Sequence, residues 1–153
     1  MFRLVLPVAI ALGTTAAAQS DTACRLTDDS DNCNRVVACV GDQGRWFNGR
    51  AFGRGEGTFA GTINDGVTCD GTWMSRNWLG LGQADVTCSD GMSGRVYYTY
   101  QDPYTGTAIG KGRTTDGTVL QMWSGLNVLA YLRGDSGEPV ANLPCPNGDI
   151  PMS

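Results

Sequence analysis

The 153-residue sequence predicts an all-β fold, an antiparallel meander of about eight short strands held by disulfides, with a short helix or irregular segment at the N-terminus. Three observations support this class. Twenty-two glycines divide the chain into short segments, Asp-Gly pairs separate several of them, and all six cysteines follow an apolar leader. Asp-Gly between strand-like segments is typical of hairpin turns, which need a positive φ. A small barrel, a sandwich and an open array of hairpins all fit this pattern.

Residues 1–18 have the features of a secretory signal peptide. Arg3 precedes an apolar segment, Leu4–Leu12, and a run of alanines ends at Ala18. The apolar segment has about half of the roughly 20 residues that a membrane-spanning helix needs. We therefore expect cleavage before Gln19, export to the periplasm or the extracellular space of a bacterium, and no membrane span in the mature chain.

The expected mature chain is acidic. It has ten Lys and Arg residues against fifteen Asp and Glu, so its net charge is about −5. Phosphate binding needs clustered cations, and the sequence therefore predicts no nucleic-acid partner and disfavours an anionic lipid surface. A cationic partner remains compatible with this charge.

Six cysteines in an exported chain indicate three disulfides. One pair follows from strand register: a hairpin centred between Trp78 and Leu79 places Cys69 opposite Cys88. Cross-strand neighbours lie about 4.5–5.5 Å apart, a distance that a disulfide can bridge. The same register places Trp73 opposite Ala84.

The other four cysteines leave several pairings open. We assign Cys24 to Cys33 and Cys39 to Cys145, so that the second bond attaches the last segment of the chain to the first. The sequence contains neither Cys-x-x-Cys nor histidine, so we expect no metal site and no cofactor.

Residues 19–44 form the least regular part of the sequence. Asp31 is a candidate N-cap for a short helix over Asn34–Val40. The acidic residues 28–32 lack the glycine and the final glutamate of an EF-hand loop, so we expect a solvated loop there rather than a calcium site.

A β-meander is expected over residues 45–133, followed by an irregular tail, 134–153, rich in Gly, Pro and Asp. The turns fall at 64–66, 89–91, 101–104 and 115–117, where Gly, Asp, Asn or Pro cluster. The predicted strands are Arg45–Phe52, Gly57–Ile63, Val67–Trp73, Leu81–Cys88, Gly94–Tyr100, Thr107–Thr114, Thr118–Trp123 and Asn127–Leu132.

Part of the meander repeats. Asp-Gly pairs at 65/66, 90/91 and 116/117 recur at steps of 25 and 26 residues, and each follows a Gly-x-Gly. The segment Cys69-Asp70-Gly71-Thr72-Trp73, with Gly80-Leu81-Gly82 and Asp90-Gly91 after it, resembles MORN repeats, which are hairpin units of about this length. The resemblance implies a structural or binding array and no enzyme.

The second half of the chain carries another resemblance, over 86–91, 105–108, 119–125 and 128–132. The order of these segments is similar to that in periplasmic inhibitors of C-type lysozyme, which are small exported β-barrels with a disulfide. The resemblance implies a loop, Thr105–Gly112, that enters the lysozyme cleft, with Thr105, Thr107 and Lys111 as contacts. An acidic protein would complement a basic lysozyme.

Catalysis is not expected. Without histidine, it would rest on carboxylates, as in glycosidases. The candidates are Glu56, Asp65, Asp70, Asp85 and Asp90. Asp65 and Asp90 are explained by their turns, and Glu56 and Asp85 alternate with inward residues and should face solvent.

Aromatic side chains are the remaining candidates for a binding face: Trp46, Trp73, Trp78, Trp123, Tyr97, Tyr98 and Tyr100. We expect Trp73, Tyr97 and Trp123 to build the core, and alternation places Tyr98 and Tyr100 on one side of their strand. Trp78 falls in a turn and is the first candidate for an exposed contact.

The sequence therefore predicts a non-catalytic structural or ligand-binding domain of the bacterial envelope, with a protein or glycan ligand. An inhibitor of a cationic hydrolase such as C-type lysozyme comes second, and a carboxylate-dependent glycan hydrolase third.

Overall fold

The computed structural model describes residues 24, 25, 27, 32–125 and 142–151. The predicted signal peptide, the candidate cap Asp31 and the predicted strand Asn127–Leu132 lie outside the described residues.

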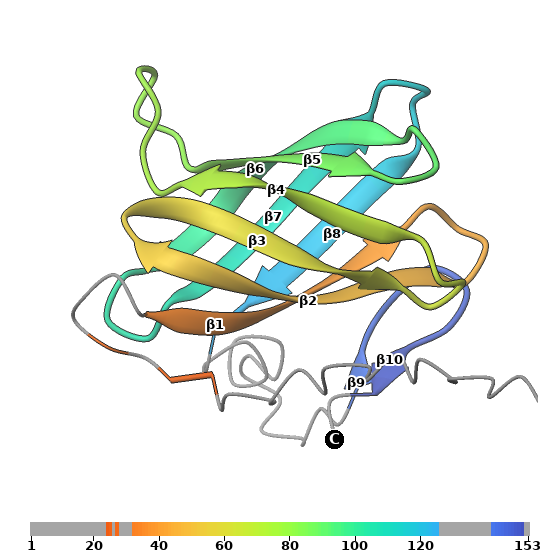
Figure 1. Cartoon of the computed structure of the whole chain (residues 1–153), viewed down its shortest axis with the longest axis horizontal. Coiled ribbons are helices and arrows are strands. Elements are labelled where there is room, and N and C mark those ends of the chain that lie inside the picture. Colours follow the sequence, from red (N-terminus) through yellow and green to blue (C-terminus); the bar gives the residue numbers. More distant parts are fainter. Residues whose placement is uncertain (1–23, 26, 28–31, 126–141, 152–153) are drawn as a thin grey trace, which may run out of the picture.

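Eight antiparallel strands follow one another around a closed barrel, and β1 pairs with β8 to complete it (Figure 1). The all-β meander is thus confirmed, and of the three arrangements that the sequence allowed, it adopts the barrel. The strands are β1 (Cys33–Val40), β2 (Arg45–Arg54), β3 (Glu56–Ile63), β4 (Thr68–Met74), β5 (Gln83–Cys88), β6 (Ser93–Asp102), β7 (Thr107–Thr114) and β8 (Val119–Ser124).

The predicted helix over Asn34–Val40 is wrong, because these residues belong to strand β1. Val36 packs in the barrel interior, whereas its neighbour Val37 packs in a second cluster outside the wall. Because the strand is buried on both faces, its second half is apolar. Such an apolar segment shows no two-residue alternation from which a strand could be predicted. The barrel accordingly begins at Cys33 rather than at Arg45.

All six cysteines are paired as assigned from the sequence: Cys24–Cys33, Cys39–Cys145 and Cys69–Cys88. The register of β4 against β5 also agrees, with Trp73 opposite Ala84. Three disulfides indicate an oxidising environment outside the cytoplasm.

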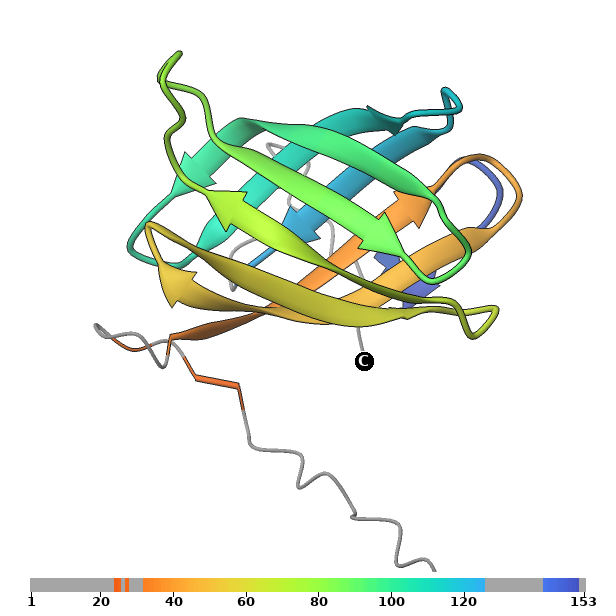
Figure 2. The ribbon, with the colours of Figure 1, turned by 45° about the horizontal axis from the view of Figure 1, so that its top comes forward.

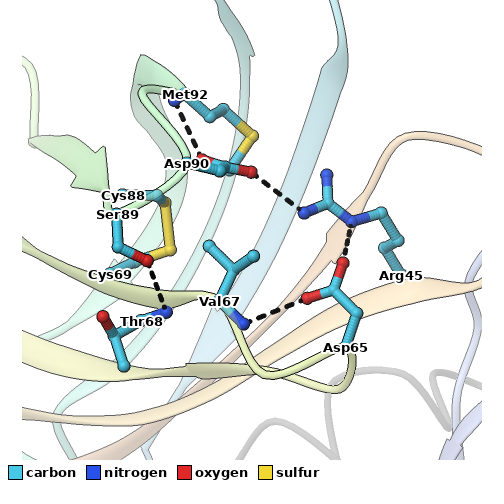
Figure 3. The surroundings of a disulfide bond; sticks show 9 residues. All are labelled: Arg45, Asp65, Val67, Thr68, Cys69, Cys88, Ser89, Asp90 and Met92. Atoms are coloured by element: carbon cyan, nitrogen blue, oxygen red, sulfur yellow. Dashed lines mark hydrogen bonds and ion pairs between the residues drawn. A yellow bond between two sulfur atoms is a disulfide. The ribbon is translucent and has the colours of Figure 1, made fainter.

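The three Asp-Gly turns lie at the same end of the barrel, here called the turn end. The guanidinium of Arg45 lies 2.7 Å from Asp65 and 3.2 Å from Asp90, and so joins two of these turns beside the Cys69–Cys88 disulfide (Figure 3). The amide of Val67 donates a hydrogen bond to Asp65, and this bond together with Arg45 lowers the pKa of the Asp65 carboxyl. Two of the three Asp-Gly turns are therefore linked through one guanidinium.

The C-terminal segment covers the outer face of β1, β7 and β8. Its short strands β9 (Asn142–Leu143) and β10 (Ile150–Pro151) pair with each other, so the described part of the predicted irregular tail is ordered (Figure 1). Leu143 and Ile150 pack against Val37, Ile109 and Trp123. Trp123 is fully buried there, which confirms it as a core residue, although its core lies outside the barrel.

Glycines in the wall make room for aromatic rings. The edge of the Phe59 ring lies where Gly71 would carry a Cβ atom, and Phe47 lies in the same way over Gly49 and Gly61. The two rings meet edge to face, with centroids 6.1 Å apart. These inward glycines allow the wall to bend tightly around a small core.

Candidate functional site

The barrel interior contains a cavity of about 550 Å³. Ligand pockets in proteins typically have volumes of about 300–1,000 Å³. The space is left open because several inward positions carry small side chains, among them Ala38, Ala51, Ala84 and Ala108. Larger apolar residues complete the lining, including Val36, Val40, Phe59, Val86, Met92, Val96, Leu120 and Met122.

The cavity reaches the end opposite the turn end, here called the open end. There the β2–β3 turn, the β4–β5 loop and the β6–β7 turn meet around it. The lining becomes polar at this level, with Asn32, Asn34, Arg54, Ser75, Arg76, Gln101 and Asp102. The site therefore combines an apolar interior with a polar opening, an arrangement that suits an amphipathic molecule.

Asp102 holds the β6–β7 turn in shape. Its carboxylate accepts hydrogen bonds from the Thr105 hydroxyl at 2.7 Å and from the Tyr104 amide at 3.0 Å. These bonds lower the pKa of Asp102, that of the hydroxyl most. At neutral pH the carboxylate is therefore ionised, and both of its oxygens accept hydrogen bonds within the turn.

Tyr98 supplies a polar group inside the cavity. Its ring lies where Gly82 would carry a Cβ atom, close to Gly110, and both glycines come from Gly-x-Gly triplets. The hydroxyl makes no hydrogen bond to another described residue, and burial raises its pKa, so it stays protonated. A neutral phenol in an apolar cavity is both a donor and an acceptor for a ligand.

Two expectations about the neighbours of Tyr98 are wrong. A register shift between Tyr98 and Tyr100 places Tyr100 opposite Ile109, on the outer face, so the two tyrosines do not share a side. Tyr97 is 40% exposed, because the inward positions of β6 are taken by Val96 and Tyr98.

Trp73 is a further aromatic residue that lines the cavity. It lines the cavity and packs against the core, in agreement with its predicted position, and its indole nitrogen donates a hydrogen bond to the Phe52 carbonyl at 3.0 Å. An indole fixed in this way reports on the polarity of the cavity.

The predicted loop Thr105–Gly112 is wrong beyond its first two residues, because β7 begins at Thr107. Thr107 is 1% exposed, and its hydroxyl lies 2.8 Å from that of Thr105. Lys111 is exposed on the outer wall, opposite Tyr97. The structure therefore does not present these three residues on one projecting loop, and lysozyme inhibition stays a prediction.

Trp78 is 90% exposed, as predicted, in the β4–β5 loop at the open end. The candidate carboxylates Glu56 and Asp85 are on the outer wall, where Asp85 pairs with Arg95. Within 24–25, 27, 32–125 and 142–151, no three His, Cys, Asp or Glu residues are grouped to hold a metal ion. That part of the chain also contains no helix with the length and apolarity to cross a membrane.

Fold and site together define a small disulfide-bonded β-barrel with a hollow, mainly apolar interior. No family model and no curated protein matches the chain. Among solved structures it is similar to a redesigned β-barrel, mFAP0, bound to DFHBI, with 18% identity and a TM-score of 0.49 over 61% of this chain and 95% of that one.

Two further barrels show a comparable likeness. The redesigned barrel mFAP1, bound to DFHBI, has 19% identity and a TM-score of 0.48, over 61% of this chain and 92% of that one. A de novo designed fluorescence-activating β-barrel has 18% identity and a TM-score of 0.47, over 61% of this chain and 89% of that one. The likeness concerns the fold alone.

Proposed function

We propose that this protein is an exported, non-catalytic binding domain of a bacterial envelope that takes a small apolar or amphipathic molecule into its barrel. The observation that carries the proposal is the cavity of about 550 Å³, lined mainly by apolar side chains and reaching the open end. Apolar surface inside a preformed cavity gains free energy when an apolar ligand replaces water. Such a lining suits a hydrocarbon or aromatic body better than a glycan, because sugar hydroxyls would lose their hydrogen bonds there.

Filling the cavity is expected to abolish binding. In Ala84→Phe, the new ring occupies the space between Trp73 and Val96, so we expect the affinity for the uncharged dye Nile red to fall at least tenfold. The measurement is a fluorescence titration, with the tryptophan emission of the protein, to which Trp73 contributes, as a second signal. Ala38→Leu, which fills the cavity from β1 instead of β5, should also lower the affinity for the dye.

Ala60→Phe is the matched control, because Ala60 is exposed on the outer wall and the variant adds the same ring there. It should bind the dye as the unmodified protein does. Full dye binding by Ala84→Phe and Ala38→Leu, with unfolding midpoints unchanged, would contradict an interior site.

The Tyr98 hydroxyl is expected to select for ligands with a polar group. Tyr98→Phe removes the hydrogen bond that the hydroxyl would make to the polar group of the ligand and leaves the ring in place. The affinity for a long-chain fatty acid should therefore fall by about fivefold to tenfold. The affinity for the hydrocarbon of the same length should not change. Displacement of Nile red measures both. An equal loss for the two ligands would show that the ring, and not the hydroxyl, makes the contact.

A further inference from the structure

The β4–β5 loop, residues 75–82, projects beyond the barrel at the open end (Figures 1 and 2). Its three large apolar side chains are all exposed to solvent: Trp78, Leu79 and Leu81. Its single charged residue is Arg76, which also lines the opening of the cavity. Exposed tryptophan and leucine together at the end of a loop indicate a contact surface, since they lower the solubility of a free protein.

The loop is held in one conformation by Asn77. The Asn77 side-chain oxygen accepts hydrogen bonds from the amides of Leu79 at 2.9 Å and Leu81 at 3.0 Å, and its nitrogen donates to Gln83 at 2.8 Å. The Asn77 amide donates to the Leu81 carbonyl at 2.7 Å. The apolar side chains are therefore presented on an ordered backbone, which reduces the entropy lost on binding.

The shape of this surface favours a lipid interface over a protein. A stable protein interface buries about 800 Å² on each partner, over a broad patch. A narrow loop with three apolar side chains does not offer such a patch, but a lipid interface accepts single tryptophan and leucine side chains among its head groups. The acidic chain as a whole disfavours an anionic surface, so the contact would depend on apolar insertion, with Arg76 at the level of the lipid phosphates.

We propose that the open end docks on a zwitterionic phospholipid surface through Trp78, Leu79 and Leu81. Tyr104, 93% exposed on the β6–β7 turn, stands at the same end and adds a second aromatic contact. Docking in this orientation directs the cavity opening to the lipid. The inference goes beyond the proposed function, because it concerns the outer surface and does not depend on any interior ligand.

The test is co-sedimentation of the oxidised chain from Gln19 with phosphatidylcholine–phosphatidylethanolamine vesicles, so that the apolar segment Leu4–Leu12 cannot bind them itself. The unmodified chain should partition to the vesicles, and Trp78→Ser should weaken the partition about tenfold or more. Val119→Ser is the matched control: Val119 is also exposed but lies at the turn end, and its variant should bind normally. Trp78→Phe should keep binding yet lose the blue shift of tryptophan emission.

Equal binding by the unmodified chain and Trp78→Ser, absence of binding, or binding that requires anionic lipid would each overturn the proposal. The cavity variant Ala84→Phe separates this inference from the proposed function. It should still sediment with vesicles, since its change is interior. Dye binding without vesicle binding would overturn docking alone, and vesicle binding without dye binding would overturn the interior site alone.

Discussion

Removing the Cys39–Cys145 disulfide is expected to lower the free energy of unfolding by about 4–5 kcal/mol, the largest stability effect that we predict. The bond closes a segment with a sequence separation of 106 residues, so its loss gives the largest increase in the conformational entropy of the unfolded chain. It also holds the C-terminal strands over Trp123, which is buried outside the barrel. The double variant Cys39→Ala/Cys145→Ala should therefore show red-shifted tryptophan emission, and urea unfolding gives the free energy.

The comparison is Cys69→Ala/Cys88→Ala, whose disulfide has a sequence separation of 19 residues. Loop closure predicts a smaller loss there, about 3 kcal/mol. Cys39, Cys69 and Cys88 are buried and Cys145 is half-buried, so the two variants differ in the length of chain that each bond closes and in the attachment of the C-terminal strands. Equal losses in the two variants would show that chain length does not control the effect.

Gly71→Ala is expected to lower the free energy of unfolding by about 3 kcal/mol, because the position has no room for a methyl group. A Cβ atom on Gly71 would lie 1.9 Å from the Asp85 carbonyl oxygen and 2.6 Å from the Phe59 ring. The first of these neighbours is backbone, so the variant must move strand β5 or the ring. Thermal and urea unfolding measure the loss.

Gly91→Ala separates steric collision from loss of glycine flexibility. Gly91 has a φ of 87° and no heavy atom within 4 Å of an added Cβ, so only the backbone conformation disfavours alanine. We expect a loss of about 1 kcal/mol there. A loss at Gly71 no larger than that at Gly91 would show that the wall adjusts to the methyl group.

The site was only partly predictable. The exposure of Trp78 followed from its position in a turn, because a turn residue has little against which to pack. The cavity was not predicted, although its sign is in the sequence: Ala38, Ala51, Ala84 and Ala108 occupy inward positions. Whether small inward residues leave a space or let the walls approach depends on which strands face each other, and that is set by closure of the barrel.

The tyrosines show the same limit at one strand. Two-residue alternation holds from Val96 to Tyr98, but the shift at Thr99 moves Tyr100 to the outer face. The residue before it gives no local indication of a bulge, so alternation alone assigned Tyr100 to the wrong side. That the Tyr98 hydroxyl has no hydrogen bond to another described residue likewise became clear only from the three-dimensional structure.

The sequence by itself determined the β-meander, its turns and the Cys69–Cys88 disulfide, because turn residues and strand register act between neighbours along the chain. The pairings Cys24–Cys33 and Cys39–Cys145 were assigned without such a register, and the structure confirms them. Tertiary structure alone decided three features: closure into a barrel, the hollow interior, and the C-terminal cover over a second core. Each depends on contacts between segments far apart in sequence, such as β1 with β8, whose apolar residues are compatible with more than one partner. The partner strands are selected because only one arrangement buries the apolar faces of all strands at the same time.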